Sequence, residues 1–146
     1  MNKKLERYRQ LRDKKKARLE KAQKDMDRLE QIFAMQKALN DDIERRRGLH
    51  FTQEEWIEKT ILATLAELAE VLEESNYKWW KNDKPIDEAA LKEELVDVLH
   101  FFVSLCLRSG MDAEELYARY LDKNRENFDR QYGRSARKGY EVEEHG

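Results

Sequence analysis

The chain has 146 residues, of which 41% are charged and 40% hydrophobic, and its formal net charge is −2. This length is sufficient for one domain with a hydrophobic core. No apolar run approaches the roughly 20 residues of a membrane span, and the charged N-terminus lacks the apolar stretch of a signal peptide. Cys106 is the sole cysteine, which excludes an internal disulfide framework and favours a reducing compartment. We therefore expect a cytoplasmic protein with no membrane contact.

Residues 1–28 form a charged segment, and residues 1–30 hold twelve Lys and Arg residues against six Asp and Glu residues. We expect a solvent-exposed helical extension of the first helix of the fold. A coiled-coil arm or another protein-contact element is the alternative. A basic excess also suits nucleic acid, but stacking aromatic residues are nearly absent here, so we expect no nucleic-acid partner.

Residues 29–46 continue as an amphipathic helix, whose inward side chains are predicted to be Leu29, Ile32, Phe33, Met35 and Leu39. The run Arg45-Arg46-Arg47-Gly48 predicts the end of this helix, because basic residues and glycine favour helix C-termini.

Capping residues predict where the later helices begin. Thr52 and Glu55 form a capping box that opens a helix reaching about Ser75. After a loop, Asp87 caps a helix that runs to Arg108. Asp112 opens a last helix to about Tyr132, and the remaining tail is polar.

Glycine and proline are scarce, with five and one residues respectively, which favours long helices. We therefore predict an all-α fold, a bundle of four to five helices with the charged extension at its N-terminus. Two apolar stripes are predicted to form its core: Ile61, Leu65, Leu68, Ala69 and Leu72 on one helix, and Leu91, Leu95, Val98, Phe102 and Leu105 on the next.

Two acidic pairs are the main candidates for chemistry. The first pair is Glu67 and Glu70, and the second is Glu94 and Asp97. The two residues of each pair are three positions apart in a predicted helix, so they lie on one helix face. At about 4 Å, two such charges repel each other by roughly 1 kcal/mol in water and about 4 kcal/mol at an effective dielectric constant of 20. Hard divalent cations are the usual partners of carboxylate oxygens. The alternative is that these are ordinary solvated acids on amphipathic helices.

Two further clusters remain open to a structural or a functional interpretation. The segment Tyr77-Lys78-Trp79-Trp80-Lys81 is either an anchor for packing or a wall for a flat base with a lysine near phosphate. The basic C-terminal segment is either solvated or binds an anion; its residues are Lys123, Arg125, Arg130, Arg134, Arg137 and Lys138.

Together, these motifs resemble the dimeric all-α dUTP diphosphatases, relatives of the MazG-type nucleoside triphosphate pyrophosphatases. The resemblance covers about residues 29–140. It rests on the two acidic pairs and on Gln36-Lys37-Ala38-Leu39-Asn40, Trp79-Trp80-Lys81, Asp97-Val98-Leu99-His100-Phe101 and the segment from Lys123 to Gln131. The interval from Arg130-Gln131 to Gly139-Tyr140 is longer than in the family motif, and residues 1–28 have no counterpart in it.

The resemblance implies a domain at 29–140, flanked by the extension 1–28 and a polar tail 141–146. It implies hydrolysis of dUTP, and of dUDP, to dUMP in nucleotide-pool sanitation, with two or more Mg²⁺ ions and a homodimer. Glu67, Glu70, Glu94 and Asp97 would hold the metal, and Glu67 or Glu70 would accept a proton from water. The base and sugar would contact Gln36, Asn40, Trp80, His100 and Phe101, and the phosphates would contact Lys81, Lys123, Asn127, Arg130, Lys138 and Tyr140.

Two alternatives to dUTP hydrolysis remain. One is the same chemistry on another nucleotide, such as dCTP or one with a damaged base. The other is a non-catalytic helical protein that contacts a partner through its basic N-terminal helix.

Overall fold

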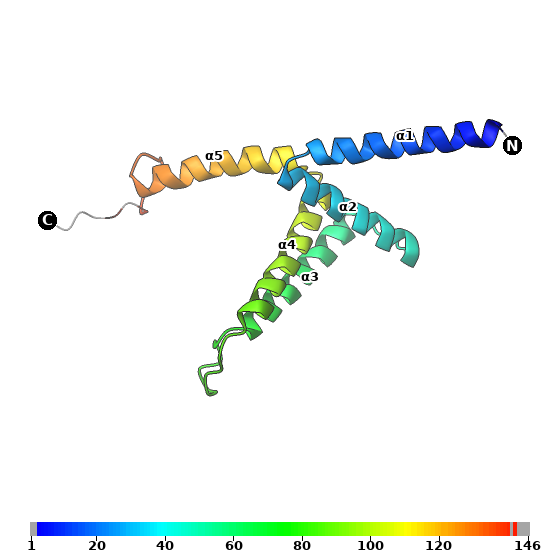
Figure 1. Ribbon diagram of the computed structural model, residues 1–146. Coiled ribbons are helices and arrows are strands. Elements are labelled where there is room, and N and C mark those ends of the chain that lie inside the picture. The colour runs from blue at the N-terminus through cyan, green and yellow to red at the C-terminus, as the bar shows by residue number, and fades with distance from the viewer. Residues whose placement is uncertain (1–2, 141, 143–146) are drawn as a thin grey trace. The chain divides into compact units, whose positions relative to one another are not determined.

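The computed structural model describes residues 3–140 and 142, without the side chains of residues 3–5, 8, 19 and 22–25. Over these residues the fold is all-α, as predicted, and no strand occurs among them. The five helices are α1 (Lys3–Asp25), α2 (Arg28–Arg47), α3 (Gln53–Glu73), α4 (Glu88–Arg108) and α5 (Ala113–Gln131), as Figure 1 shows. None of the described helices is both long and apolar enough to cross a membrane. The predicted tail 141–146 lies outside the described residues except for Val142.

The chain divides into two compact units, residues 1–49 with α1 and α2 and residues 50–146 with α3, α4 and α5. The prediction of a separate domain at 29–140 is not tested by this division and stays a prediction.

In the first unit, α1 does not continue into α2, so the prediction of one extended helix is wrong. Asp27 interrupts the helix and caps α2: its carboxylate accepts a hydrogen bond from the Glu30 backbone N–H at 2.9 Å. The Glu30 carboxylate accepts one from the Asp27 N–H, also at 2.9 Å. This capping box satisfies backbone donors that a new helix start leaves without partners. Every described side chain of α1 between residues 6 and 21 is exposed, as expected for a solvated helix.

The other helix ends agree with the sequence. Thr52 and Glu55 form the predicted capping box, Asp87 accepts hydrogen bonds from the N–H groups of Ala89 and Ala90, and Asp112 accepts one from Glu115. Gly48 ends α2 with φ at 60°, a left-handed conformation in which a glycine carries no Cβ penalty.

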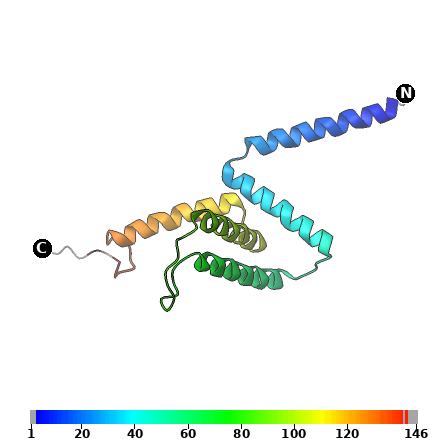
Figure 2. The same cartoon turned by 60° about the horizontal axis from the view of Figure 1, so that its bottom comes forward.

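Helices α3 and α4 lie side by side as a hairpin (Figures 1 and 2). At one end of the hairpin, the Arg108 guanidinium lies 3.9 Å from the centre of the Trp56 ring. Gln53 there donates a hydrogen bond from Nε2 to the Arg108 carbonyl at 2.9 Å. These contacts join the start of α3 to the end of α4 and fix how the two helices align.

The less exposed positions of the two helices follow a regular spacing, at Thr60, Thr64, Glu67 and Val71 on α3 and at Leu91, Glu94, Asp97, Val98, Phe101 and Ser104 on α4. Residues spaced by three and four lie on one helix face. We call the two facing stripes the α3–α4 seam. Acidic residues from both predicted pairs therefore lie within the seam.

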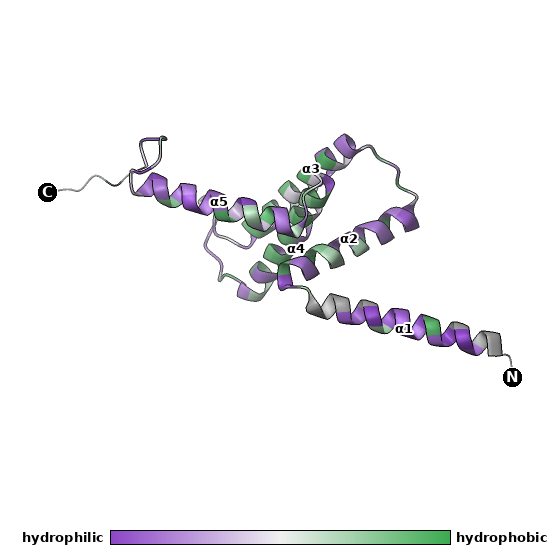
Figure 3. Ribbon diagram, turned by 90° about the horizontal axis from the view of Figure 1, so that it is seen from above, coloured by the Kyte–Doolittle hydropathy of each residue, from purple (hydrophilic) through white to green (hydrophobic). Residues whose placement is uncertain are grey.

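The predicted core stripe of α3 is exposed, so that part of the prediction is wrong, whereas Leu91, Val98 and Leu105 of the predicted α4 stripe are half-buried and Phe33 of α2 is buried. Leu62 is 66% and Leu65 is 57% exposed. The same holds for Ile61, Leu68, Leu72, Leu95 and Phe102 in the hairpin, and for Met35 and Leu39 on α2. The physical reason on α3 is that two helices bury only the stripes along which they meet, and the seam uses a different stripe of that helix. Figure 3 shows the apolar residues on α3 and α4, whereas α1 is mainly hydrophilic where it is coloured.

Candidate metal centre

Three carboxylates from α3 and α4 converge at the seam. Glu67, Glu70 and Glu94 each offer one oxygen atom, and these atoms all lie within 4.8 Å of one another. Glu67 and Glu70 are separated by one turn of α3, and Glu94 comes from the facing helix. The hairpin thus brings Glu94 of the second acidic pair close to both residues of the first pair. We call these three residues the carboxylate cluster.

The electrostatics of the cluster oppose full ionisation. The pKa of the Glu67 carboxyl is raised above its ordinary value of 4.5. Partial burial is the largest cause, and the negative charges of Glu70 and Asp97 add to it. Burial is also the largest cause that raises the pKa of Glu94, and the neighbouring charges of Glu70 and Asp97 raise it further. Both effects disfavour the charged form. A cation between these groups would remove the repulsion.

The donor set fits a hard divalent cation. Glu94 Oε2 is a buried atom with no hydrogen-bond partner within the described part of the chain, which is costly for a carboxylate unless another group compensates it. All the converging atoms are carboxylate oxygens, the ligand type that Mg²⁺ and Ca²⁺ prefer. Asp97, the fourth predicted ligand, is not part of the cluster, but its charge acts on both Glu67 and Glu94.

The two amide residues predicted at the base contact each other. Gln36 is buried and donates a hydrogen bond from Nε2 to Oδ1 of Asn40 at 2.9 Å. Both residues belong to the first compact unit. Their role at a base stays a prediction.

The predicted aromatic wall is a cluster at the surface. Trp79 is 86% exposed, and its ring meets that of Trp80 edge to face with centroids 5.6 Å apart. Tyr77 meets Trp80 in the same manner at 6.5 Å. On α4, His100 is exposed and Phe101 is half-buried. The interpretation of these residues as a base and sugar pocket stays a prediction.

The C-terminal motif forms a folded turn after α5. Glu126 Oε1 accepts hydrogen bonds from Arg130 Nε at 2.9 Å and from the Ser135 hydroxyl at 2.7 Å, and these bonds lower the pKa of Glu126. Tyr140 lies close to Arg130, with 5.4 Å from the guanidinium carbon to the ring centre. The turn accommodates the longer interval between Arg130 and Tyr140. Ser135, which the sequence analysis did not select, is buried and closes it.

The remaining phosphate candidates lie at the surface near this turn. Lys138 Nζ donates a hydrogen bond to the Gly133 carbonyl at 3.0 Å. Lys123 borders an open depression together with Arg119, Asp122 and Glu126, and Asn127 is exposed. That these three residues contact phosphate stays a prediction.

Comparison with known proteins adds an independent finding. The model of a family described as dUTPase matches residues 28–112. The chain is 34% identical to the dCTP pyrophosphatase of Enterobacteria phage T4 over 87 residues, an alignment that covers 50% of this chain and 51% of the phage protein. It is 47% identical to the dCTP pyrophosphatase of Enterobacteria phage LZ5 over 47 residues, covering 32% of this chain and 27% of that protein. The chain therefore spans about half or less of the length of these relatives. No solved structure matches it.

Proposed function

Since the chain belongs to the dUTPase family, whose model matches more than half of it, we propose that it is a divalent-metal-dependent pyrophosphohydrolase of pyrimidine deoxynucleoside triphosphates. The preferred substrate is dUTP, with dUDP as a second substrate of the same site. The observation that supports this proposal most directly is the convergence of Glu67, Glu70 and Glu94 within 4.8 Å. These carboxylates form a site suited to a cation that binds phosphate, as the proposed reaction requires.

The carboxylate cluster and Asp97 would hold Mg²⁺, two or more ions in all. Bound Mg²⁺ would neutralise phosphate charge and lower the pKa of a bound water. Glu67 or Glu70 accepts the proton of the attacking water. The water oxygen forms a new bond to phosphorus, the bridging P–O bond breaks, and dUMP and pyrophosphate are the products.

The base is selected by Gln36 and Asn40, whose amide groups offer both donors and acceptors. Uracil presents a ring N–H donor, whereas cytosine presents a ring nitrogen acceptor and an amino group. Because both phage relatives are dCTP pyrophosphatases, dCTP is the second candidate substrate. The two bases require opposite orientations of at least one amide group.

The test is a nucleotide panel with Mg²⁺, containing dUTP, dCTP, dTTP, UTP and dUDP, with products resolved by chromatography. Selective formation of dUMP and pyrophosphate from dUTP supports the proposal. Selective conversion of dCTP supports the same reaction but assigns cytosine, and not uracil, as the preferred base. Absence of turnover with every nucleotide overturns the enzymatic function and leaves the non-catalytic alternative.

We also propose that the protein is a homodimer that buries the exposed leucines of the hairpin. Leu62, Leu65 and Leu68 are all exposed on α3, and Leu95 and Leu99 are exposed on α4. Exposed apolar side chains gathered on a helix hairpin are typical of an interaction site. A second copy offers the same face, so a two-fold arrangement covers both. Location in the cytoplasm stays the prediction made from the lone Cys106, which is buried.

A further inference from the structure

Helix α1 is strongly basic, although the chain as a whole is not. Residues 3–25 contain eleven Lys and Arg residues against four Asp and Glu residues, a net charge of +7 (11 − 4). The whole chain has a net charge of −2, so the remaining residues together carry −9 (−2 − 7). The positive charge is therefore concentrated in a helix that lies outside residues 28–112, the part matched by the family model.

The charges of α1 are segregated by sign around the helix. Glu6, Asp13 and Glu20 are spaced by seven residues, which is close to two helical turns, so they form one narrow acidic stripe. At about 100° per residue, five basic residues of α1 fall within an arc of about 120° that holds no acid between residues 6 and 21. We call them the basic face, and they are Arg7, Lys14, Lys15, Arg18 and Lys21.

The charges of the basic face are exposed and uncompensated within the described chain. All five side chains are exposed, and none forms an ion pair with a side chain that the structure describes. The described ion pairs of α1 join other residues, Arg12 with Asp13 at 3.0 Å and Lys16 with Glu20 at 3.8 Å. These pairs neutralise part of the acidic stripe and leave the basic face fully charged.

Neighbouring charges of the basic face repel each other. Lys14 and Arg18 are four positions apart, and Arg18 and Lys21 are three apart, so these like charges are neighbours on the helix surface and destabilise an isolated helix. A helix stabilised by its own charges would place opposite signs at these spacings, as Lys16 and Glu20 do. A polyanion along the basic face would remove the repulsion.

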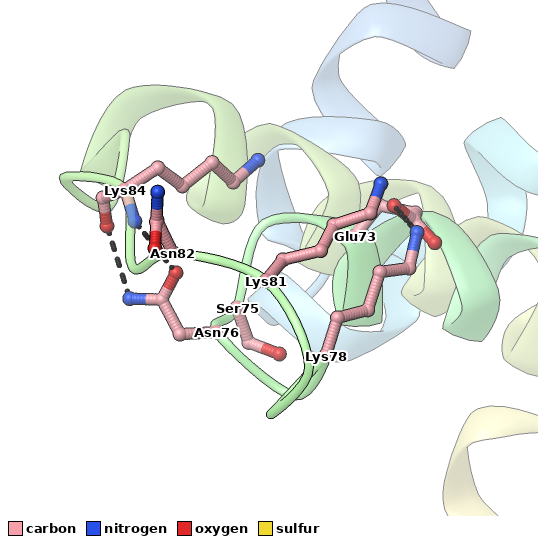
Figure 4. A pocket seen from close by; sticks show the side chains of 7 residues that line it. All are labelled: Glu73, Ser75, Asn76, Lys78, Lys81, Asn82 and Lys84. Carbon is pink, nitrogen blue, oxygen red and sulfur yellow. Dashed lines mark hydrogen bonds and ion pairs between the residues drawn. The ribbon is translucent and has the colours of Figure 1, made fainter.

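The lysines of the loop between α3 and α4 are arranged differently (Figure 4). Asn76 closes that loop, because its Nδ2 donates a hydrogen bond to the Lys84 carbonyl and its Oδ1 accepts one from the Lys84 N–H, each at 3.0 Å. We call these two bonds the Asn76–Lys84 clip. The hydrogen bond from Lys78 to the Glu73 carboxylate, at 2.7 Å, lowers the pKa of Glu73, and the charge of Lys84 lowers it further. The loop lysines thus have a carboxylate beside them, whereas the basic face has none among the described side chains.

We propose that α1 binds the phosphate backbone of double-stranded DNA through the basic face. Double-stranded DNA carries about one negative charge per 1.7 Å of its axis, and the basic face extends about 21 Å from Arg7 to Lys21 at 1.5 Å per residue. The major groove of B-form DNA is about 12 Å wide and admits an α-helix, whose diameter is about 10–12 Å. The major groove of double-stranded RNA is too narrow for side chains to read, so DNA is the duplex that suits α1.

The expectation of no nucleic-acid partner rested on the scarcity of stacking aromatic residues in the N-terminal segment. Proteins use aromatic side chains to stack the unpaired bases of single strands. The bases of a duplex stay stacked on each other, and its affinity for proteins comes largely from phosphate contacts. The charge pattern of α1 therefore replaces that expectation with duplex DNA as the partner.

An anionic membrane suits α1 less well than a DNA duplex. A helix that lies on a membrane buries a continuous apolar face. The apolar stripe of α1 contains Leu5, Tyr8 and Leu19, and the charged residues Arg12 and Lys15 interrupt it at the same heptad spacing.

A second copy of α1 is also a poor partner. In a coiled coil along the apolar stripe, the flanking positions of each helix include Arg9, Lys16 and Arg18. Charges at such positions decide which helices pair, and two α1 helices would present basic residues to each other.

The experiment titrates the full chain into a fluorescently labelled DNA duplex of mixed sequence and follows anisotropy between about 50 and 200 mM salt. EDTA is present, so that no divalent ion links DNA phosphates to the carboxylate cluster. The test variant Arg7→Gln/Lys14→Gln/Arg18→Gln removes three charges of the basic face. The control Arg9→Gln/Arg12→Gln/Lys16→Gln removes the same net charge from exposed positions elsewhere on α1. Glutamine is a good helix former, so circular dichroism should show equal helix content in all three proteins.

The salt dependence of binding counts the phosphate contacts, because each contributes about −0.9 to the slope of log affinity against log salt concentration. Five contacts predict a slope of about −4.5 for wild type, and two remaining contacts predict about −2 for the test variant. We expect the test variant to bind DNA about tenfold or more weakly at about 100 mM salt, and the control to keep the wild-type slope.

Three results overturn the proposal: no binding of wild type at about 50 mM salt, a wild-type slope shallower than about −2, or equal weakening in both variants. Tighter binding to an RNA duplex of the same sequence also overturns it. Binding to vesicles of phosphatidylserine and phosphatidylcholine, without binding to DNA, overturns it in favour of a membrane surface. The measurement involves no nucleotide hydrolysis, so its result is independent of the proposed function.

Discussion

Glu70 of α3 and Glu94 of α4 hold carboxylate oxygens within 4.8 Å of each other, although they belong to different helices. This proximity exists only when the hairpin is folded. The folded state therefore gains a repulsion that the unfolded chain lacks, and a proton or a cation relieves it. We therefore expect the stability of the folded protein to depend on pH and on bound metal.

The first prediction concerns pH in the absence of metal. Because the pKa of Glu94 is raised in the folded state, the folded protein binds more protons than the unfolded chain just above pH 4.5. Its free energy of unfolding then falls as pH rises through this range. We expect the Tm of Glu94→Gln relative to wild type to increase as pH rises from 4.5, measured by circular dichroism in EDTA. Glu93→Gln, which removes a neighbouring exposed carboxylate, should show no such increase; an equal increase would contradict the role of the cluster.

The second prediction concerns metal binding. A ligand that binds only the folded state at 100 times its Kd stabilises it by about 2.7 kcal/mol. For a chain of this size, each kcal/mol raises the Tm by about 3 °C. Saturating Mg²⁺ at neutral pH should therefore raise the wild-type Tm by several degrees. Glu70→Gln should lose most of that rise, whereas an equal rise in this variant would place the metal elsewhere.

The third prediction concerns the exposed leucine face. Leu62→Glu places a charge on the face assigned to the homodimer, so light scattering after gel filtration should give the mass of one chain for this variant and of two chains for wild type. Leu11→Glu changes an exposed leucine of α1 and should remain dimeric. Dissociation by Leu11→Glu alone would instead support the coiled-coil arm.

The fourth prediction concerns the C-terminal turn. Ser135→Ala removes the hydrogen bond that contributes most to the lowered pKa of Glu126 and should lower the free energy of unfolding at neutral pH. A lowered folded pKa gives stability that is present above pH 4.5 and is lost as pH falls through the folded value. The difference from wild type should therefore shrink below pH 4.5.

The matched control for that substitution is Ser75→Ala, whose hydroxyl donates to the Leu72 carbonyl. Its effect on stability should not change with the ionisation of Glu126. A Ser135→Ala effect that stays constant between neutral pH and pH 3, measured by denaturant unfolding, would contradict the role of this hydrogen bond.

Local chemistry made the helix starts predictable from the sequence. A capping residue such as Thr52 or Asp87 acts on backbone groups within three positions, so its effect is visible in a short stretch of sequence. The same logic applies to Asp27 and Glu30, although the charged run around them contains no glycine or proline to mark a break between helices.

Packing partners were less predictable than helix starts. Periodicity shows that Leu65 and Leu68 share a face, but it does not show which surface that face meets. In the structure, the face of α3 that meets α4 contains Thr60, Thr64 and Glu67 instead. The Asn76–Lys84 clip and the Glu126–Ser135 contact join residues eight and nine positions apart in irregular chain, where no periodic pattern exists to predict them.

The most direct test of the central claim is pyrophosphate release from an equimolar mixture of dUTP and dCTP by wild type and Glu94→Gln, each with Mg²⁺ and with EDTA. We expect wild type with Mg²⁺ to release pyrophosphate, mainly from dUTP, and EDTA or Glu94→Gln to reduce the rate by about 10-fold or more, the smallest loss seen even for residues that only orient a metal ligand. Equal release by wild type and Glu94→Gln, or release that persists in EDTA, would contradict the assignment of the carboxylate cluster as the catalytic metal site.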